Sequence, residues 1–280
     1  MKCAWQAYLN LLPHRIRQDV DTLGKDDLQE LRLRIGQPPE LVFQSTYKYL
    51  SQETTKNDIA FVINAASEYS PWAAGTVGQG FITGQGGHRI GICGVCTVFD
   101  GKMTGISQPT SLCIRVSRDF YGCAQKAANI QDSILIIGPP GSGKTTLLRD
   151  LIRQKSNSGQ GSVAVIDERE EIFPLYKGSH CYQAGERSDI LAGCRKADGV
   201  DAVIRSMNPR WIAVDEITAQ SDADALLQAG WCGVHLLATA HAGSVYDLKT
   251  RPIYQQLIRY NLFANVIVLH RDKSWTLERI

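Results

Sequence analysis

The 280-residue sequence has no run of about 18 apolar residues, which is the length that a membrane-spanning helix needs. Its first 20 residues, MKCAWQAYLNLLPHRIRQDV, are interrupted by polar side chains and have no continuous apolar core, so they are not typical of a signal peptide. Internal repeats and low-complexity segments are absent as well. These absences predict a protein of the cytoplasm.

Neither sign of charge is in excess. The sequence has 30 Lys and Arg residues and 28 Asp and Glu residues, which give a formal net charge of +2. A balance this close predicts neither strong binding to nucleic acid nor strong attraction to a membrane surface, although local patches can still form. With 44% hydrophobic and 21% charged residues, the composition is typical of a soluble globular protein. The length allows one large domain or two ordinary ones.

The eight cysteines lack the spacing of a disulfide framework or of a zinc site. Cys93 and Cys96 form one C-x-x-C pair, whereas Cys113 and Cys123, the nearest candidates for a second pair, have the wrong spacing. In a cytoplasmic protein, scattered cysteines act as small buried hydrophobic residues. We therefore expect Cys93 and Cys96 to pack in a core, and a metal or redox role is the weaker alternative.

The pattern of the sequence changes near residue 125. Before this point a helical start is followed by β-type segments with many glycines, such as LQELRLRIG, in which apolar and charged side chains alternate. Asp100 and Gly101 separate two β-type runs, which is a strong hairpin signal. We predict a small α+β domain over residues 1–125.

From residue 126 to residue 280, short apolar segments alternate with amphipathic ones. The predicted strands are SILIIG, SVAVID, WIAVDE, HLLATAH and NVIVLH, with SWTLERI as an edge strand, and helical segments lie between them. Wholly apolar strands are typical of parallel sheets that are covered on both faces. This order predicts a doubly wound α/β domain with a mostly parallel sheet.

One motif in this half predicts a phosphate site. The stretch GPPGSGKTT fits the P-loop pattern G-x-x-x-x-G-K-[ST] completely, and it follows a predicted strand and opens a predicted helix. Its glycines let successive N–H groups turn toward phosphate oxygens, and the helix N-terminus adds the positive end of its dipole. Lys144 would reach the β- and γ-phosphates, and the Thr145 hydroxyl would coordinate Mg²⁺. The predicted ATP-binding residues are Gly138, Pro139, Pro140, Gly141, Ser142, Gly143, Lys144, Thr145 and Thr146.

Hydrolysis also needs carboxylates near the metal ion and the attacking water, and the segment RWIAVDEI supplies a pair. Asp215 and Glu216 follow a predicted strand, at the edge of an open α/β sheet where ligands bind. We expect Asp215 to hold Mg²⁺ through water and Glu216 to polarise the attacking water. Capping of the next helix by these acids is the weaker alternative.

Four more acidic residues lie at the end of the preceding strand, in VAVIDEREEIF. They are Asp167, Glu168, Glu170 and Glu171. Two interpretations fit this pattern equally well. The segment can be a solvated loop, as charged runs usually are, or it can place further carboxylates, Glu171 among them, near the γ-phosphate.

Two histidines, His235 and His241, lie at the two ends of the apolar segment LLATA. Residues six positions apart on a strand are roughly 20 Å apart, so the pair cannot share a metal ion or form a catalytic dyad. His241 ends the strand at the nucleotide edge, with Thr239 nearby, where a polar residue can sense the γ-phosphate. For His235, at the far end, we expect a structural role.

In this order the motifs resemble those of the secretion ATPases of type II and type IV systems. The Walker A box corresponds to Gly138–Thr145, the Asp box to VIDEREE, the Walker B box to IAVDEI and the His box to GVHLLATAHAGS. The resemblance implies a RecA-like P-loop ATPase domain, ATP and Mg²⁺ as cofactors, and a hexameric ring. Thr218 stands where these ATPases usually have an arginine after the Walker B glutamate, so a role for that arginine is not implied here.

A closer resemblance extends from residue 11 to about residue 245. The segments LPHRIRQDV, LQELRLRIGQPPEL, SLCIRVSRDFYGCA and AGERSDILAGCRKADGVDAVIRSMNP, among others, resemble the stage III sporulation AA family, which are ATPases of endospore-forming bacteria. The resemblance implies an ATPase of the mother-cell cytoplasm. It would power the assembly of, or transport through, a channel between mother cell and forespore, as a homohexamer docked on a membrane protein partner.

A ring ATPase completes its nucleotide site with arginines from a neighbouring subunit or from the N-terminal domain. The first candidates are Arg205 and Arg115, the latter at the position where many secretion ATPases present such an arginine. Further candidates are Arg89, Arg118, Arg187 and Arg195. For each of them a surface or interdomain ion pair is the alternative.

Three other functions stay open from the sequence. A RecA-like ATPase that depends on nucleic acid fits the P-loop, but the near-neutral charge and the lack of a basic aromatic strip argue against it. A nucleoside kinase needs an Arg-rich lid and an acceptor pocket, and it does not need paired Asp and Glu residues on its third strand. The last alternative is a nucleotide-binding switch with little turnover.

Overall fold

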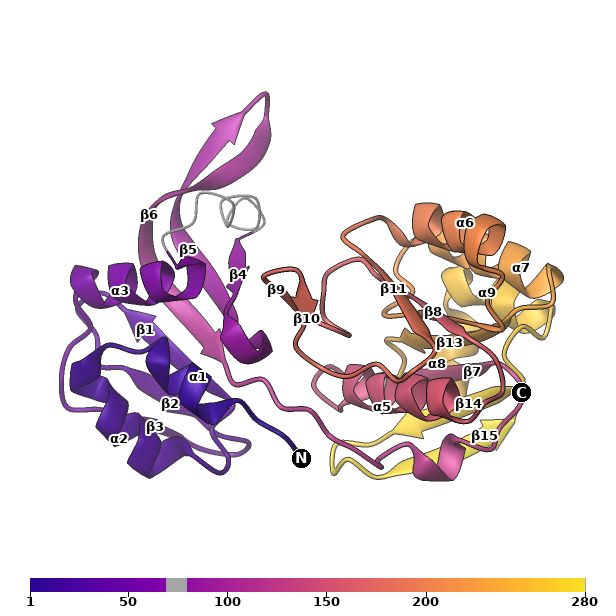
Figure 1. Ribbon diagram of the computed structural model, residues 1–280, viewed down its shortest axis with the longest axis horizontal. Coiled ribbons are helices and arrows are strands. Elements are labelled where there is room, and N and C mark those ends of the chain that lie inside the picture. Colours follow the sequence, from indigo (N-terminus) through magenta and orange to yellow (C-terminus); the bar gives the residue numbers. More distant parts are fainter. Residues whose placement is uncertain (69–79, 280) are drawn as a thin grey trace. The chain divides into compact units, whose positions relative to one another are not determined.

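The computed structural model of the chain describes residues 1–68 and 80–279. The chain divides into two compact units, each with a hydrophobic core of its own (Figure 1). The first unit comprises Met1–Asp119 and Pro174–Cys181, and the second comprises Phe120–Phe173 and Tyr182–Ile280. A short segment from the second half of the sequence is therefore part of the first unit.

The first unit is built on a six-stranded sheet in the order β3-β2-β1-β6-β5-β4, in which all neighbours are antiparallel. In β1, Leu31 and Leu33 are buried and alternate with charged residues, as the sequence predicts. The strands are β1 (Glu30–Arg34), β2 (Glu40–Val42), β3 (Tyr47–Tyr49), β4 (Phe81–Thr83), β5 (Arg89–Phe99) and β6 (Lys102–Arg115). The α-helices of the described part are α1 (Trp5–Asn10), α2 (His14–Gly24) and α3 (Lys56–Ser67).

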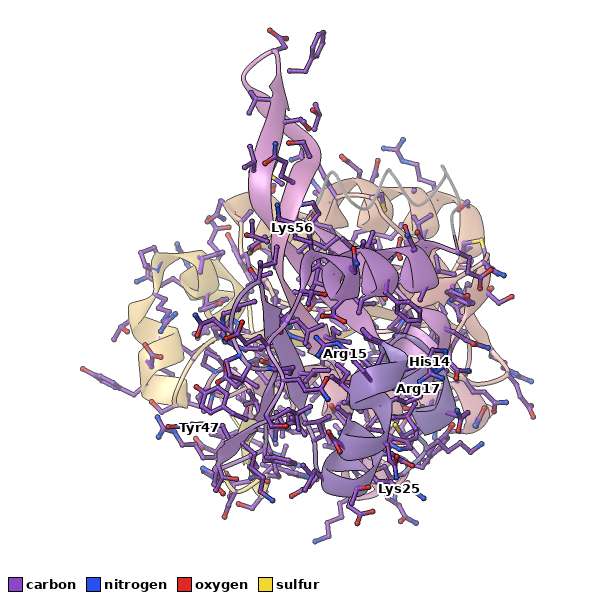
Figure 2. All side chains as sticks on the ribbon, turned by 90° about the vertical axis from the view of Figure 1, so that its left-hand side faces the viewer. His14, Arg15, Arg17, Lys25, Tyr47 and Lys56 are labelled. Atoms are coloured by element: carbon purple, nitrogen blue, oxygen red, sulfur yellow. The ribbon has the colours of Figure 1, made fainter. Side chains whose placement is uncertain are left out.

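A buried carboxylate joins two of these helices. Asp58, in the first turn of α3, forms a capping box with Thr55 and also accepts a hydrogen bond from Nε of Arg15 on α2 at 2.9 Å. Arg15 is labelled in Figure 2, in which the first unit faces the viewer. Burial is the largest single influence on the pKa of Asp58 and acts to raise it. The Arg15 guanidinium and the Thr55 groups together outweigh burial, so the pKa is lowered. The charge at the start of α3 is thus held by both capping and ion pairing.

β5 and β6 form a long hairpin with Asp100 and Gly101 at its turn, as the sequence predicts. Both turn residues have positive φ, +50° and +70°, which is typical of a type I′ turn. The prediction that Cys93 and Cys96 pack in a core is wrong, because both are exposed. Among the described residues, β5 pairs beyond Ile92 with β6 alone, and the side chains of β5 from Cys93 to Phe99 are exposed (Figure 1). All eight cysteines are free and none of them is buried.

The second unit contains a seven-stranded sheet in the order β11-β8-β12-β13-β7-β14-β15. All pairs are parallel except β14 with β15, so the predicted α/β fold with a mostly parallel sheet is confirmed. The strands are β7 (Ile134–Ile137), β8 (Val163–Asp167), β11 (Ser188–Ala192), β12 (Trp211–Val214), β13 (His235–Ala240), β14 (Asn265–Leu269) and β15 (Trp275–Arg279). The α-helices of the described part are α5 (Lys144–Asn157), α6 (Lys196–Met207), α7 (Gln220–Trp231), α8 (Val245–Thr250) and α9 (Pro252–Arg259).

Alternate residues of the central strands enter cores on opposite faces of this sheet. In β7, Leu135 and Ile137 belong to a cluster that includes residues of α6, α7 and α9, whereas Ile134 and Ile136 belong to a cluster with residues of α5. All four side chains are buried. Burial on both faces explains why these strands are continuous apolar runs in the sequence.

Parts of the second half differ from the predicted pattern. β11 was not predicted because it is an edge strand with the mixed sequence SDILA. β9 (Leu175–Tyr176) and β10 (Ser179–His180) form a small hairpin in the segment that belongs to the first unit. The segment between β13 and β14 forms two helices, α8 and α9, and Pro252 occupies the start of α9, where its missing N–H costs nothing.

The buried imidazole of His88 should make the stability of the first unit depend on pH. Its Nδ1 accepts the N–H of Ser117, so the neutral ring carries its proton on Nε2, which donates to the Ala4 carbonyl at 3.0 Å. Burial lowers the pKa of His88 from 6.5 to about 4. As pH falls through 6.5, the unfolded chain takes up the proton first, so the free energy of unfolding should decrease by about 2 kcal/mol between pH 7 and pH 5.

Urea unfolding of the wild type and of His88→Gln at these two pH values measures this dependence. The variant lacks the titrating ring and should show a decrease smaller by about 2 kcal/mol, whatever its stability at pH 7. An equal decrease in both proteins would mean that His88 is not held neutral by the fold.

Candidate active site

Polar residues meet at one edge of the sheet in the second unit. β8, β12, β13 and β7 are consecutive neighbours and run parallel, so their carboxyl ends lie at the same edge. The residues that end or directly follow these strands are Asp167, Asp215, His241 and Gly138. All four predicted boxes are therefore brought to the edge at which open α/β sheets bind ligands.

The stretch from Gly138 to α5 has the geometry of a phosphate-binding loop. Gly141 and Gly143 have φ of +71° and +102°, a region that favours glycine. A Cβ on Gly138 would lie 2.7 Å from Ser142 Oγ and 2.8 Å from the Leu269 carbonyl oxygen, so only glycine fits there. Among the described residues, the buried Ser142 hydroxyl has no hydrogen-bond partner. The first N–H groups of α5 have no acceptor within the helix, so this loop fits an anion.

Asp215 joins three elements through its two carboxylate oxygens. Thr145 Oγ1, at the start of α5, donates to Asp215 Oδ2 at 2.8 Å. The hydroxyl of Thr239, which is fully buried on β13, donates to Asp215 Oδ1 and accepts the N–H of Glu216 at 2.8 Å. Hydroxyl and carboxylate oxygens are ligands that Mg²⁺ prefers, so the pair Thr145 and Asp215 fits this cation.

Glu216 has a positive φ of +42°, which is uncommon for a residue with a side chain. Its N–H is held by Thr239 Oγ1 and, at 3.0 Å, by Asp215 Oδ1. A strained backbone of this kind costs about 1–3 kcal/mol and persists where neighbouring groups enforce it. At this residue the backbone leaves the extended conformation of β12.

His241 connects the lysine of the P-loop to this glutamate. Lys144 Nζ contacts the carbonyl oxygens of Gly138 and Pro139 at 3.0 and 3.1 Å, and His241 Nδ1 at 3.1 Å. Because an ammonium group only donates, Nδ1 must accept, and the neutral ring carries its proton on Nε2, which donates to Glu216 Oε1 at 2.7 Å. Burial lowers the pKa of Lys144, and the charges of Glu216 and Asp215 oppose this effect.

The acidic segment after β8 is an ordered turn. Asp167 is 2% exposed, and its carboxylate accepts the N–H groups of Glu171, Ile172 and Phe173 at 2.8, 3.0 and 2.7 Å. Burial raises the pKa of Asp167, and these backbone donors oppose the rise. Arg149 of α5 donates to the carbonyls of Ile172 and Glu171 at 2.5 and 2.9 Å. The segment is thus fixed to both β8 and the helix that follows the P-loop.

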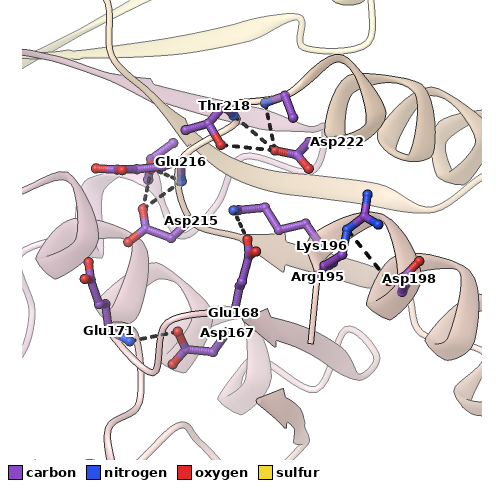
Figure 3. Close-up of polar contacts among 12 residues, drawn as sticks. Asp167, Glu168, Glu171, Arg195, Lys196, Asp198, Asp215, Glu216, Thr218 and Asp222 are labelled. Atoms are coloured by element: carbon purple, nitrogen blue, oxygen red, sulfur yellow. Dashed lines mark hydrogen bonds and ion pairs between the residues drawn. The ribbon is translucent and has the colours of Figure 1, made fainter. Parts of the chain in front are cut away.

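Carboxylates from this segment and from the end of β12 surround a cavity of about 20 Å³ (Figure 3). The lining includes Lys196, which begins α6 and forms an ion pair with Glu168. Sequence reasoning missed Lys196, because it follows Arg195 in a polar stretch that is typical of an exposed helix start. The lining residues are Ile166, Asp167, Glu168, Arg169, Glu171, Lys196, Asp215 and Glu216.

The two predicted arginines lie in exposed ion pairs. Arg115 of the first unit pairs with Glu30 at 3.3 Å, and Arg205 pairs with Asp201 at 2.7 Å. Arg205 lies nine residues after Lys196 on α6, which is about 13 Å along the helix axis. Within the second unit of a single chain, the site is therefore built without either arginine.

His235 lies at the amino end of β13, at the opposite edge of the sheet from His241. Its ring packs on that of Trp211, with 4.8 Å between the ring centroids. Burial lowers the pKa of His235, and the charge of Arg210 lowers it further. The surroundings of this histidine are those of a packing residue.

The relatives of the chain include a sporulation protein and a pilus assembly ATPase. The sequence model of the family described as "Sporulation stage III, protein AA" matches residues 4–277. The chain belongs to this family. Stage III sporulation protein AA of Bacillus subtilis (strain 168) is 37% identical over 258 residues, which cover 89% of this chain and 84% of the relative. The type IV pilus assembly ATPase TfpB of Acinetobacter baylyi is 34% identical over 123 residues, which cover 44% of this chain and 20% of that protein.

Two solved structures share the fold of this family member. The ATPase DotB of Legionella pneumophila matches with a TM-score of 0.60 at 18% identity, over 95% of this chain and 78% of that one. The pilus retraction motor PilT with bound ADP matches with a TM-score of 0.63 at 16% identity, over 91% and 76%. Among residues 1–68 and 80–279, no helix is both long and apolar enough to cross a membrane.

The hydroxyl of Thr239 should be needed to hold Glu216 in place. In Thr239→Val the Glu216 N–H loses one of its two acceptors and Asp215 Oδ1 loses a hydroxyl donor, and each such hydrogen bond contributes about 0.5–1.5 kcal/mol. We expect lower stability in urea unfolding and faster hydrogen exchange of the Glu216 amide. Thr239→Ser is the control, since it keeps the hydroxyl and loses only a buried methyl group. Equal exchange of this amide in the two variants would contradict the prediction.

Proposed function

We propose that the chain is a Mg²⁺-dependent ATPase whose second unit is a RecA-like catalytic domain. The observation that carries the proposal is the hydrogen-bonded series Lys144–His241–Glu216, which joins a P-loop lysine to a carboxylate at the same sheet edge. A P-loop alone binds phosphate, whereas hydrolysis also needs a group that orients water. Glu216 has this chemistry, and His241 connects it to the lysine.

Each part of the site has a role in this proposal. The loop from Gly138 to Thr146 binds the phosphates of ATP, and Thr145 and Asp215 hold Mg²⁺. When bound, Mg²⁺ supplies positive charge that offsets the charge of the phosphate oxygens. Glu216 accepts a hydrogen bond from the attacking water and takes its proton as a general base.

The three contacts of Lys144 support a role of His241 in sensing phosphate. To reach a phosphate, Lys144 must leave the carbonyls of Gly138 and Pro139 and the Nδ1 of His241. The imidazole then loses the donor that fixes its orientation, and its contact with Glu216 changes with it. Arrival of the γ-phosphate is thereby communicated to the group that activates water.

Three further residues extend the proposed site. Glu171 lines the cavity beside Asp215 and Glu216, which supports a role as an additional acid. The guanidinium groups of Arg115 and Arg205 are both exposed, so both are available to a neighbouring subunit. The resemblance to secretion ATPases supports a homohexamer in which such arginines complete the site.

Membership of the sporulation family supports the cellular role. We infer that the protein acts in the cytoplasm of the mother cell and docks at the membrane through a protein partner. There it powers assembly of, or transport through, the channel to the forespore. The similarity to a type IV pilus assembly ATPase and to a pilus retraction motor supports a motor role, for which we expect hydrolysis to move one domain of this chain against the other.

Glu216→Gln should lower kcat for phosphate release from ATP by about 100-fold or more, because general-base catalysis contributes about 10²- to 10⁴-fold. The affinity for ATP should change little, since the glutamine keeps the size and hydrogen-bonding capacity of the side chain. Steady-state phosphate release and a fluorescence titration with nucleotide measure the two effects. Glu186→Gln, at an exposed position away from the cavity, is the matched control.

The same assay separates the competing functions. Stimulation of the wild type by DNA would favour an ATPase that depends on nucleic acid, although the net charge of +2 argues against it. ADP without free phosphate would indicate phosphoryl transfer to another acceptor. Oligomers that bind ATP and Mg²⁺ without turnover would indicate a nucleotide switch.

The two histidines should behave differently. His241→Ala should reduce kcat by roughly 10- to 100-fold, because misplacing a reacting group by about 1 Å can cost about 100-fold. His235→Ala should instead lower the melting temperature and leave kcat of the folded protein close to that of the wild type, because it removes packing against Trp211. Equal losses of kcat in two folded variants would rule out this division of roles.

A further inference from the structure

A buried lysine lies at the start of α6 in the second unit. Lys196 is 6% exposed, and its Nζ forms an ion pair with Glu168, whose side chain is 33% exposed. Burying an ammonium group costs free energy that a single ion pair does not generally recover, so such a pair is weak evidence for a role in stability. Its position in the fold indicates a different role.

The pair forms part of the wall of the cavity between the ends of β8 and β12 (Figure 3). The volume of about 20 Å³ is the space that one water molecule needs. Lys196 and Arg169 are the only cationic residues of the lining. The carboxylates of the lining belong to Asp167, Glu168, Glu171, Asp215 and Glu216. Without Lys196, Glu168 would face four other carboxylates with only one cation among them.

A glycine brings Lys196 to this place. A Cβ on Gly199 would lie 2.7 Å from Ile166 Cγ2 on β8 and 2.9 Å from Cys194 Sγ. Real Cβ atoms do not come so close, so α6 can contact β8 in this way only because residue 199 has no side chain. Ile166 directly precedes Asp167, and the close packing therefore places the first turn of α6 beside the end of the strand.

We propose that Lys196 is a positioning residue of the hydrolysis site, where its ion pair with Glu168 holds that carboxylate on the cavity wall and keeps the space beside Glu216 open for the attacking water. This inference rests on the proposed ATPase function. Lys196 acts through Glu168 and does not touch the reacting atoms. Its removal lets Glu168 move away from the other carboxylates of the lining, and the water site changes its shape.

Another buried lysine of the second unit, Lys155, provides a contrast. Lys155 donates to the carbonyls of Ala128 and Ile130 and lies 4.3 Å from the centre of the Trp211 ring, at the opposite edge of the sheet. Its partners are backbone groups that belong to the fold. Lys155→Met therefore removes a buried ammonium group of the same unit without touching the cavity, and it is the matched control for Lys196→Met.

The test is steady-state phosphate release from ATP by the full chain with Mg²⁺. In Lys196→Met we expect kcat to fall roughly 10- to 100-fold, as for a misplaced reacting group, with KM for ATP within about twofold of wild type. Lys196→Arg should retain most of the activity. The double variant Lys196→Met with Glu168→Gln should recover much of kcat, because the unpaired carboxylate is then gone. Lys155→Met should lower the melting temperature and leave kcat of the folded protein unchanged.

Three results would overturn the inference: unchanged kcat in folded Lys196→Met, a loss that Lys196→Arg does not rescue, or a double variant no better than Lys196→Met. If Lys196→Met does not fold, Glu168→Gln alone decides: here the buried ammonium group of Lys196 loses its carboxylate partner, so kcat should fall without a rise in KM. A wild type that binds ATP but releases no phosphate overturns the proposed function as well. An active wild type beside unchanged variants overturns this inference alone.

Discussion

The hydrogen bonds of Asp215 hold the candidate site together. One carboxylate oxygen is bound by Thr145 at the start of α5, and the other by Thr239 on β13, while Asp215 itself follows β12. A single side chain thereby joins the P-loop helix to two strands of the sheet. Because Thr239 also holds the N–H of Glu216, the same network fixes the positive φ at which Glu216 leaves the strand. A change at any one of these groups must alter the position of the others.

The acidic segment after β8 connects this network to the first unit through the chain itself. Asp167 and Arg149 hold its backbone up to Phe173, and the next residues, Pro174–Cys181, belong to the first unit. There Lys177 forms an ion pair with Glu68 at 2.5 Å. The backbone therefore passes between the units within a few residues of the carboxylate cavity. In the proposed ATPase, this covalent path is where a displacement at the end of β8 would reach the first unit.

Local sequence patterns predicted most of the second unit, because both the P-loop and the buried parallel strands are encoded by short contiguous segments. Contacts between distant segments could not be predicted in this way. The charged run after β8 fitted a solvated loop or an active-site segment, and only the folded chain brings Arg149 and Asp167 onto its backbone. Lys196 is buried because Gly199 lets α6 approach β8, a steric fact that no charge pattern contains. The exposure of Cys93 could not be predicted, because a local sequence pattern does not show how far the hairpin extends.

The difference between the two histidines follows from hydrogen-bond chemistry. The ring of His241 lies between an ammonium group, which can only donate, and a carboxylate, which can only accept, so a single neutral tautomer satisfies both. His235 packs on an indole ring at the other edge of the sheet, where the shape of the ring matters more than its nitrogens. The same residue type thus bridges two polar side chains at one end of β13 and packs on a ring at the other.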